Sequence, residues 1–234
     1  MRLSLVIPCY NEAAGLPALL QRCAELTAAA AGRIEVLLVD NGSKDDSRAL
    51  MTAFAASNAS IRVVPVDVNQ GYGYGILQGL RAATTELLGW THADLQTDPQ
   101  DALRGLALFD THGSHVFVKG RRYGRPPADV AFTMGMSVYE TLLLGTPMWD
   151  INAQPTLFSR TLFAGWQRPP HDFALDLYAY YLARRAGVPV HRFPVLFAPR
   201  AHGVSHWNVN WAAKRKFIRR TVDFSLQLRK SVRT

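Results

Sequence analysis

Short apolar runs alternate with longer, mixed segments along the first half of the chain. The runs are rich in Val, Ile and Leu, as buried strands are, and the segments between them have the lengths of helices. Near-continuous apolar strands separated by helices predict an α/β fold with a mostly parallel central sheet and helices on both faces. The predicted strands are "LSLVIP" (3–8), "IEVLLVD" (34–40), "IRVVPV" (61–66) and "ELLGWTHAD" (86–94), and the predicted helices cover 15–31, 45–58, 73–85 and 99–110.

The alternation weakens after "SHVFVKGRR", a further β-rich run that ends at Arg122. The segment "RYGRPPADV" has the composition of a loop, and "WDINAQPTLFSR" that of a turn leading into a strand. Two more helices are predicted over 132–144 and 171–187, followed by a strand over 188–197. No internal repeat or linker interrupts the pattern, so we expect one domain over 1–210 and a tail over 211–234.

Polar motifs follow the predicted strands at the points where the strands end. They read "CYNE", "DNGSKDDS", "NQGYGYG" and "HADLQTD". The carboxyl ends of parallel strands meet at one edge of a sheet, which is where open α/β sheets bind their ligands. The four motifs therefore predict one site at this edge.

Composition narrows the class of protein. The 234 residues are 48% hydrophobic and 19% charged, which is typical of a globular domain. No apolar run reaches about 18 residues, and the N-terminal "MRLSLVIPCYNE" turns polar too early for a signal peptide. Two cysteines suit a reducing compartment. We expect a cytoplasmic protein without a transmembrane helix.

Basic residues are concentrated at the carboxyl end. The formal net charge is +8, and most of this surplus arises from Lys214 onward. Between Trp211 and Leu228, apolar residues recur at helical spacing opposite Lys and Arg, which predicts a basic amphipathic helix. Such a helix is typical of attachment to an anionic membrane surface, here at the inner face of the cytoplasmic membrane. The alternative is that the stripe docks on the domain and the charges are solvated.

Six motifs, taken in order, resemble family 2 glycosyltransferases and are most similar to the branch of dolichyl-phosphate and undecaprenyl-phosphate sugar transferases. They are "VIPCYNEAAGL", "LLVDNGSKDDS", "NQGYGYGI", "HADLQTDP", "DINAQPTLFSR" and "FAPRAHGVSHW". The resemblance implies a GT-A fold and an inverting, hexosyltransferase-type enzyme. Its donor would be a nucleotide-diphosphate sugar and its acceptor most often a polyprenyl phosphate, in cell-envelope glycan or glycolipid synthesis.

The resemblance assigns residues to the nucleotide sugar. Tyr10 would pack against base and ribose, Glu12 would accept from ribose hydroxyls, and Asp40 would accept from the base. A plain strand-to-helix turn would also explain Gly42 and Ser43, but it leaves Asp40 without a partner. The glycines of "GYGYG" lack the spacing of a dinucleotide fingerprint, and they would let the backbone approach the sugar phosphates. The full set is Pro8, Tyr10, Asn11, Glu12, Asp40, Gly42, Ser43, Asn69 and Gly71.

The motif "HADLQTD" is the candidate metal site. Asp94 and Gln96 alternate onto one side of the chain and offer oxygen ligands that suit magnesium or manganese. The commoner family pattern has aspartate at the position of His92. This imidazole could ligate manganese, hydrogen-bond a metal-bound water, which we favour, contact a phosphate, or simply cap the strand. Asp98, before Pro99, is expected to cap a helix.

The acceptor decides the remaining chemistry. A lipid phosphate ionises a second time at about pH 6, so it needs cations and no general base. By resemblance Arg122 is the acceptor-phosphate arginine and Ser137 its helix serine, whereas Thr133 stands where the family has a second arginine. Lys119, Arg121 and Arg125 are further basic residues in or near this segment, which could equally be a solvated loop.

A saccharide hydroxyl would instead need a base, for which Asp176 is the candidate, with Asp172 on the same helix face. By resemblance Arg200, Ser205 and His206 lie near the donor diphosphate. Outside this enzyme class, a nucleotidyltransferase should show a basic, glycine-rich loop after its first strand, where "CYNEAAGLP" is acidic. A nucleic-acid-binding protein would leave the six motifs unexplained, so no nucleic-acid partner is expected.

Overall fold

The computed structural model describes residues 1–199 and 211–231. Its first half follows the predicted alternation to within a few residues. The elements are β1 (Leu3–Cys9), α1 (Leu16–Ala29), β2 (Ile34–Asn41), α2 (Ser47–Ala55), β3 (Ile61–Val66), α3 (Tyr72–Ala82), β4 (Leu87–Trp90) and α4 (Asp101–His112). Strand β4 ends earlier than predicted, because the chain turns where the carboxylates of Asp94 and Asp98 accept the N–H groups of Gln96 and Gln100.

The second half holds one clear departure from the prediction. Its elements are β5 (Phe117–Tyr123), α5 (Pro127–Leu144), β6 (Thr156–Ser159), α6 (Arg160–Ala164), α7 (Ala174–Arg185), β7 (Val190–Leu196) and α8 (Trp211–Ser231). The loop expected over 122–130 is wrong for its last part, since α5 already begins at Pro127. A proline in the first turn of a helix loses no hydrogen bond and fixes φ near the helical value, so the Pro-Pro pair starts the helix here.

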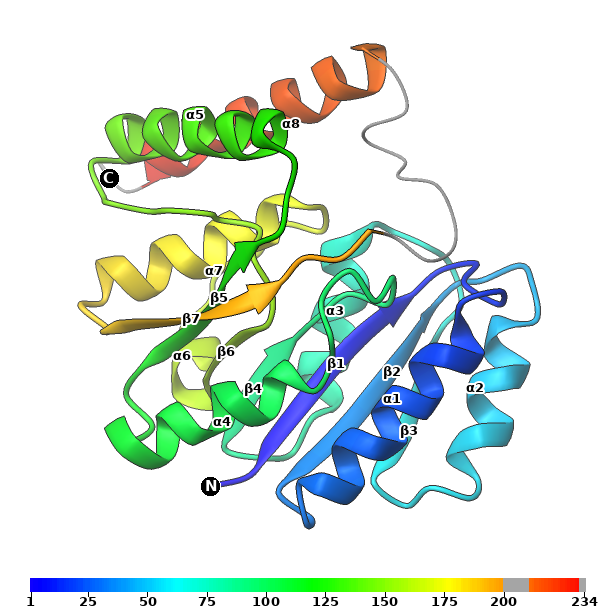
Figure 1. Cartoon of the computed structure of the whole chain (residues 1–234). Coiled ribbons are helices and arrows are strands. Elements are labelled where there is room, and N and C mark those ends of the chain that lie inside the picture. Colours follow the sequence, from blue (N-terminus) through cyan, green and yellow to red (C-terminus); the bar gives the residue numbers. More distant parts are fainter. Residues whose placement is uncertain (200–210, 232–234) are drawn as a thin grey trace.

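The seven strands form one sheet in the order β3-β2-β1-β4-β6-β5-β7 (Figure 1). Strand β6 is antiparallel to both β4 and β5, and the other strands run in one direction. The prediction of a mostly parallel sheet is therefore confirmed. The carboxyl ends of β1, β2 and β4 reach the same edge, because Val6 pairs with Leu37 and Trp90 in the two neighbouring strands.

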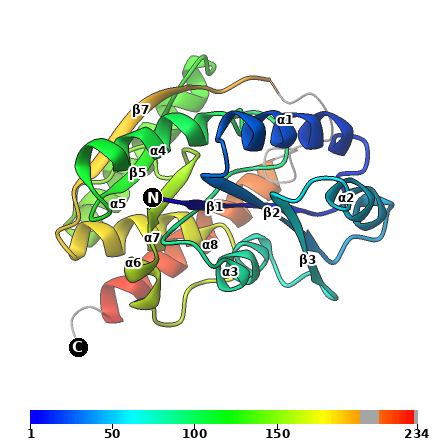
Figure 2. The same ribbon diagram turned by 90° about the horizontal axis from the view of Figure 1, so that it is seen from below.

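Helices cover both faces of the sheet, as expected (Figure 2). Helices α1 and α4 lie on one face, and α3 and α7 lie on the other. Helix α8 packs against α5 and α7. Ser225 and Leu228 of its predicted stripe are buried, so the described part of the stripe docks on the domain. None of the helices in the described ranges has the length and apolar composition to cross a membrane.

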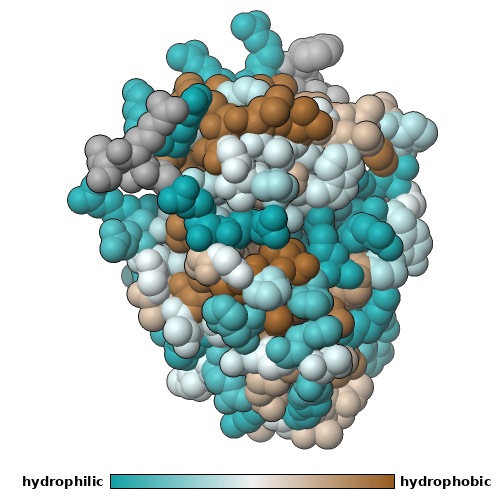
Figure 3. All heavy atoms as spheres, turned by 90° about the vertical axis from the view of Figure 1, so that its left-hand side faces the viewer, coloured by the Kyte–Doolittle hydropathy of each residue, from teal (hydrophilic) through white to brown (hydrophobic). Residues whose placement is uncertain are grey.

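The outer face of α5 remains exposed and apolar. Met134, Val138 and Leu142 lie on it, at helical spacing. Figure 3 shows an apolar band across the upper part of this side of the molecule, with hydrophilic side chains beside it. The band lies where α5 and α8 run next to each other in Figure 1.

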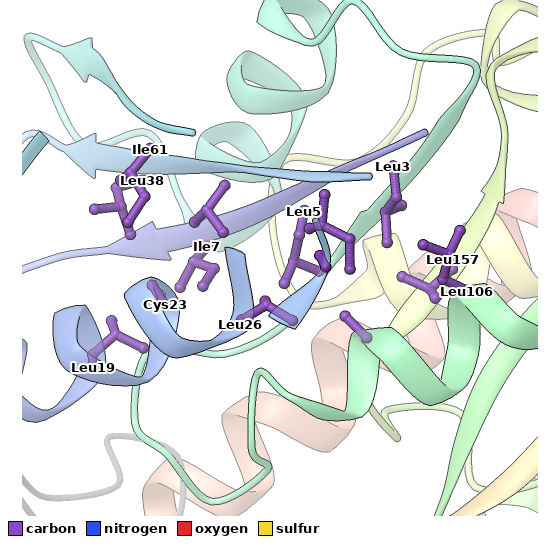
Figure 4. Packing of buried hydrophobic residues seen from close by; sticks show 14 of the residues in the cluster. Leu3, Leu5, Ile7, Leu19, Cys23, Leu26, Leu38, Ile61, Leu106 and Leu157 are labelled. Carbon is purple, nitrogen blue, oxygen red and sulfur yellow. The ribbon is translucent and has the colours of Figure 1, made fainter. Parts of the chain in front are cut away.

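The core on the α1 side shows why the sequence alternates as it does. Leu3, Leu5 and Ile7 of β1 point to the face covered by α1 and α4, where Ile7 lies near Cys23 of α1 and Leu3 near Leu106 of α4 (Figure 4). Val6, between them, points to the opposite face and joins the second cluster. Both faces of β1 are thus covered, which is why the strand reads as an unbroken apolar run.

Candidate active site

The loops after β1 and β2 are held together at the predicted edge. The backbone N–H of Asn11 donates to Ser43 Oγ at 3.1 Å, and the N–H of Lys44 donates to Asn11 Oδ1 at 2.8 Å. The N–H of Glu12 donates to Ser47 Oγ at 2.9 Å. The ring of Tyr10 is 39% exposed beside these loops, so it is free to stack on a planar ligand.

Asp40, expected to lack a partner within the turn, has two. Its Oδ1 accepts the N–H of Ser43 at 3.0 Å, and its Oδ2 lies 2.5 Å from Nε of Arg48, which also donates to Val66 O. The sequence motifs did not reveal Arg48. A basic residue in the first turn of the helix after Asp40 could have indicated this ion pair. The carboxylate is fully buried, and each oxygen keeps a lone pair for a further donor.

The glycines of "GYGYG" allow a close backbone contact that the sequence did not predict. A Cβ at Gly71, whose φ is +117°, would lie 2.3 Å from the carbonyl oxygen of His171, and a Cβ at Gly73 would lie 2.6 Å from that of Asp172. The N–H of Tyr74 donates to His171 O at 3.0 Å. These glycines therefore allow the start of α3 to pack against the chain before α7. Asn69 caps this turn by accepting the N–H of Gly71 at 2.8 Å.

The residues after β4 form a tight turn beside an aromatic stack. Leu95 has a positive φ of 55°, and Gln96 donates its side-chain N–H to Ala198 O at 3.3 Å. His92 stacks on Tyr72 with ring centroids 5.4 Å apart, and Tyr72 stacks on Phe173 at 4.5 Å. Tyr72 and Phe173 were not predicted. The stack joins the candidate metal motif to the segment before α7.

Asp94 and Gln96 are compatible with a divalent cation that takes its remaining ligands from a substrate. Since the Gln96 amide nitrogen donates to backbone, its oxygen is left as a possible ligand, next to the partly exposed carboxylate of Asp94. Across the described ranges no three His, Cys, Asp or Glu side chains are grouped to hold a metal. Two hard oxygen ligands suit magnesium or manganese, which commonly keep water and phosphate oxygens as well. Asp98 caps the next turn and pairs with Arg22.

Arg122 and Ser137 come together through a residue that the sequence motifs did not reveal. The buried carboxylate of Asp150 accepts both Nε of Arg122 at 2.9 Å and its backbone N–H at 3.1 Å. The N–H of Asp150 donates to Ser137 Oγ at 3.1 Å, and Arg125 lies 3.7 Å away. Burial alone would raise the pKa of Asp150, but the two guanidinium groups outweigh it and lower the pKa.

Arg122 and Ser137 also line a pocket of about 50 Å³. Arg122, Thr133 and Ser137 contribute polar atoms, and Thr133 accepts from Arg125 at 2.8 Å, so Arg125 reaches the turn where the family arginine was expected. The remaining wall is mostly apolar and comes from several elements, including Phe132, Met136, Ile151, Phe173, Ala174 and Leu177. The pocket combines an arginine with an apolar wall.

Lys119 is not a surface cation, although the sequence groups it with the basic residues Arg121 and Arg125. It is fully buried and donates to Ala153 O at 2.8 Å and to Thr156 Oγ1 at 2.7 Å. Burial lowers the pKa of Lys119 to about 7, although Asp176, 3.8 Å away, opposes the shift. Lys119 turns inward because it lies within β5, where side chains alternate between the two faces. Arg121, near the end of β5, is exposed.

Asp176 is also enclosed. Its carboxylate is almost fully buried and accepts from Gln154 Nε2 at 2.6 Å. A general base must reach the proton that it removes, and this carboxylate is surrounded by Gln154 and Lys119 instead of a substrate space. Asp172 accepts the N–H of Ala174, the first residue of α7. Arg200, Ser205 and His206 lie outside the described residues.

The pocket wall also holds Glu140, which makes a pH-dependent contact with α8. Its Oε1 accepts from Ser225 Oγ at 2.8 Å, and burial raises its pKa to about 7. A carboxyl whose pKa is raised by folding stabilises the fold fully below its unfolded pKa, and this contribution is lost as the pH rises through about 7.

We therefore expect the free energy of unfolding of the wild-type protein to fall by about 2 to 3 kcal/mol between acidic and alkaline conditions. In Glu140→Gln this fall should be absent. The measurement is urea unfolding of both proteins from pH 5 to pH 8, with the exposed Glu86→Gln as control. If the free energy of unfolding falls with pH equally in wild type and in Glu140→Gln, the assignment to Glu140 is wrong.

Comparison with known proteins agrees with this geometry. Residues 4–165 match the model of glycosyl transferase family 2. A segment of 109 residues is 41% identical to an undecaprenyl-phosphate 4-deoxy-4-formamido-L-arabinose transferase of Sodalis glossinidius, covering 44% of this chain and 32% of that protein. The Klebsiella pneumoniae transferase of the same name is 39% identical over 111 residues, covering 47% and 34%. The matches thus span about a third of the length of these relatives.

Solved structures share the fold. Glucosyl-3-phosphoglycerate synthase from Mycobacterium tuberculosis, in complex with Mn2+, UDP and glucosyl-3-phosphoglycerate, superposes with a TM-score of 0.73 at 18% identity, over 97% of this chain and 79% of that chain. A mannosyltransferase from Pyrobaculum calidifontis, in complex with GDP-Man and Mn2+, gives 0.67 at 21% identity, over 93% and 64%. The expected GT-A fold is confirmed. With its motifs at one sheet edge and a family match over most of its length, the chain belongs to glycosyl transferase family 2.

Proposed function

We propose that this protein transfers a sugar from a nucleotide-diphosphate donor to the phosphate of a polyprenyl phosphate, with inversion, in the synthesis of a cell-envelope glycan or glycolipid. The observation that carries the proposal is the arrangement of Arg122, Asp150 and Ser137 at a pocket with a mostly apolar wall. This pocket suits a ligand with one anionic end and a hydrocarbon chain. The curated relatives named above act on undecaprenyl phosphate according to their names.

The donor side of the site has the groups that such a substrate needs. The exposed ring of Tyr10 is available to the base, whereas Asp40, assigned to the base by resemblance, is buried and paired with Arg48 at the start of α2. Pro8, Asn11, Glu12, Gly42, Ser43 and Asn69 shape the three loops around these two residues. Asp94 and Gln96 would hold a divalent cation, which offsets the charge of the departing diphosphate when bound. Arg200, Ser205 and His206 would be further diphosphate ligands by resemblance. His92, the first residue of the metal motif, stacks on Tyr72 and would hydrogen-bond a metal-bound water.

The acceptor chemistry is a single displacement. A phosphate monoester is ionised at neutral pH, so its oxygen can attack the anomeric carbon without a general base. Arg122 would orient this phosphate, and Asp150 fixes the guanidinium in place. Transfer to a saccharide hydroxyl is the alternative, and it receives less support because Asp176 is enclosed by Gln154 and Lys119.

We expect Arg122→Ala to lower transfer to undecaprenyl phosphate at least about 100-fold, because the cation that positions the nucleophile is lost. Calorimetric titration with UDP, GDP and dTDP, each with manganese, magnesium or chelator, should identify one donor nucleotide. The affinity for that nucleotide should be the same in Arg122→Ala.

Arg121→Ala, which removes the exposed neighbouring arginine, is the matched control and should retain activity. Transfer that survives Arg122→Ala but disappears in a folded Asp176→Asn variant would instead indicate a hydroxyl acceptor. Absence of binding to all three nucleotides would remove the basis for the donor site.

A further inference from the structure

The α5 helix is unusual because large apolar side chains are exposed along its solvent-facing side. In this fully described helix the acidic residues are Asp129 and Glu140, and it has no basic residue. Asp129 is exposed in the first turn, whereas Glu140 is buried against Ser225 of α8, so the exposed positions beyond the first turn carry no charge. On the outer side Leu142 is 78% exposed, Val138 52% and Met134 44%. A helix that is apolar outward as well as inward needs a second apolar environment.

Cations lie on the neighbouring helix. Helix α8 packs along α5, and its Arg219 side chain is 85% exposed. Arg220, Arg229 and Lys230 are exposed as well. The described part of α8 contains one acidic residue, Asp223, which pairs with Arg219 at 3.8 Å. An apolar helix beside a row of exposed cations matches the layered chemistry of an anionic bilayer surface, with acyl chains below and phosphate groups above.

The pocket lies next to these helices. Phe132, Met136 and Glu140 of α5 and Thr221 of α8 form part of its wall, together with Arg122. A lipid whose phosphate lies at Arg122 would therefore extend its chain close to α5. This relation deepens the proposed function, because a polyprenyl phosphate is held in a bilayer and its transferase must reach it there.

We infer that the outer face of α5 inserts into the surface of an anionic lipid bilayer and that the exposed cations of α8 bind its headgroups. This assignment differs from the sequence expectation in one respect. The stripe of α8 was expected to enter the membrane, but its described part is already used against α5 and α7. Helix α8 contributes charge, and α5 contributes the apolar contact.

Vesicle binding tests this inference without donor or acceptor substrate. We expect the protein to co-sediment with vesicles of phosphatidylcholine and phosphatidylglycerol, more weakly with phosphatidylcholine alone, and more weakly at high salt. Leu142→Glu should lower the partition coefficient at least about tenfold, because a charge then replaces an inserted apolar side chain. Arg219→Gln should lower it about fivefold. Val68→Glu, which places the same charge on an exposed loop distant from α5, should leave it unchanged.

Wild-type protein that ignores anionic vesicles, or Leu142→Glu that binds them as well as wild type, would overturn the inference. Sedimentation velocity tests the alternative that a second copy of the chain binds the outer face of α5. If wild type is a dimer and Leu142→Glu a monomer of equal stability, with no change in vesicle binding, the face joins two copies of the chain instead. Because detergent-solubilised undecaprenyl phosphate can serve as acceptor without a bilayer, failure of vesicle binding and failure of the proposed transfer are separate results.

Discussion

Replacing Asp94 by asparagine is expected to lower kcat/KM for sugar transfer about 100- to 1000-fold, the range seen when one group that stabilises developing charge is removed. Asp94 supplies the one carboxylate in the pair of oxygen ligands, Asp94 and Gln96, that we propose for the cation in the turn after β4. Its loss weakens the attraction for the cation and leaves the diphosphate charge less well offset. The fold should be unaffected because the side chain is partly exposed.

The measurement combines initial rates with calorimetric titration of the nucleotide in the presence and absence of manganese. Asp98→Asn is the matched control, since Asp98 belongs to the same turn but caps the chain at Gln100 and pairs with Arg22. This control should lose some stability and keep its metal dependence. If Asp94→Asn retains both its rate and its manganese-dependent affinity, the cation is held elsewhere.

Asp150→Ala is expected to have the largest effect on stability. The carboxylate is buried and faces two arginines, so its removal leaves Arg122 and Arg125 in a buried site without a counter-charge. Breaking a buried ion pair from one side costs about 3 to 5 kcal/mol. For a chain of this length that corresponds to a fall in Tm of about 10 °C. Thermal unfolding measures it, with the exposed Asp129→Asn as control.

A second variant separates the structural role of Asp150 from its role at the acceptor. Asp150→Leu combined with Arg122→Met removes both charges, so much of the lost stability should return. Transfer to the lipid phosphate should remain lost, since the orienting cation is absent. A double variant that recovers transfer together with stability would show that Arg122 does not bind the acceptor.

The half of the molecule with the proposed donor site was predictable because local sequence patterns determine its strands and the polar loops that follow them. Both faces of β1 and β2 are covered, so each strand reads as an apolar run, and the polar residues that follow must lie at one edge. The predicted positions of Asp40, Asp94 and Gln96 follow from this alone. The ion pair between Asp40 and Arg48 was less visible, because it depends on which side of α2 faces β3.

The acceptor half depends on contacts between distant segments, which local patterns do not report. Asp150 approaches Arg122 only because β6 reverses direction and brings the preceding turn beside the end of β5. Lys119 belongs to a basic stretch, yet its position within β5 turns it toward Asp176. The Pro-Pro pair before α5 has the composition of a loop and starts a helix. In each case a tertiary neighbour decides the outcome.

The antiparallel strand β6 has a consequence for how this protein can evolve. It is the strand that joins β3, β2, β1 and β4, whose loops form the proposed donor site, to β5 and β7, of which β5 carries Arg122. The border between the two blocks is wider than β6 alone, because the start of α3 packs on the chain before α7 and Gln96 hydrogen-bonds to Ala198. A recombinant that exchanges everything after β4 would have to keep these contacts, so we expect it to fold only when the incoming segment matches the loops that it meets.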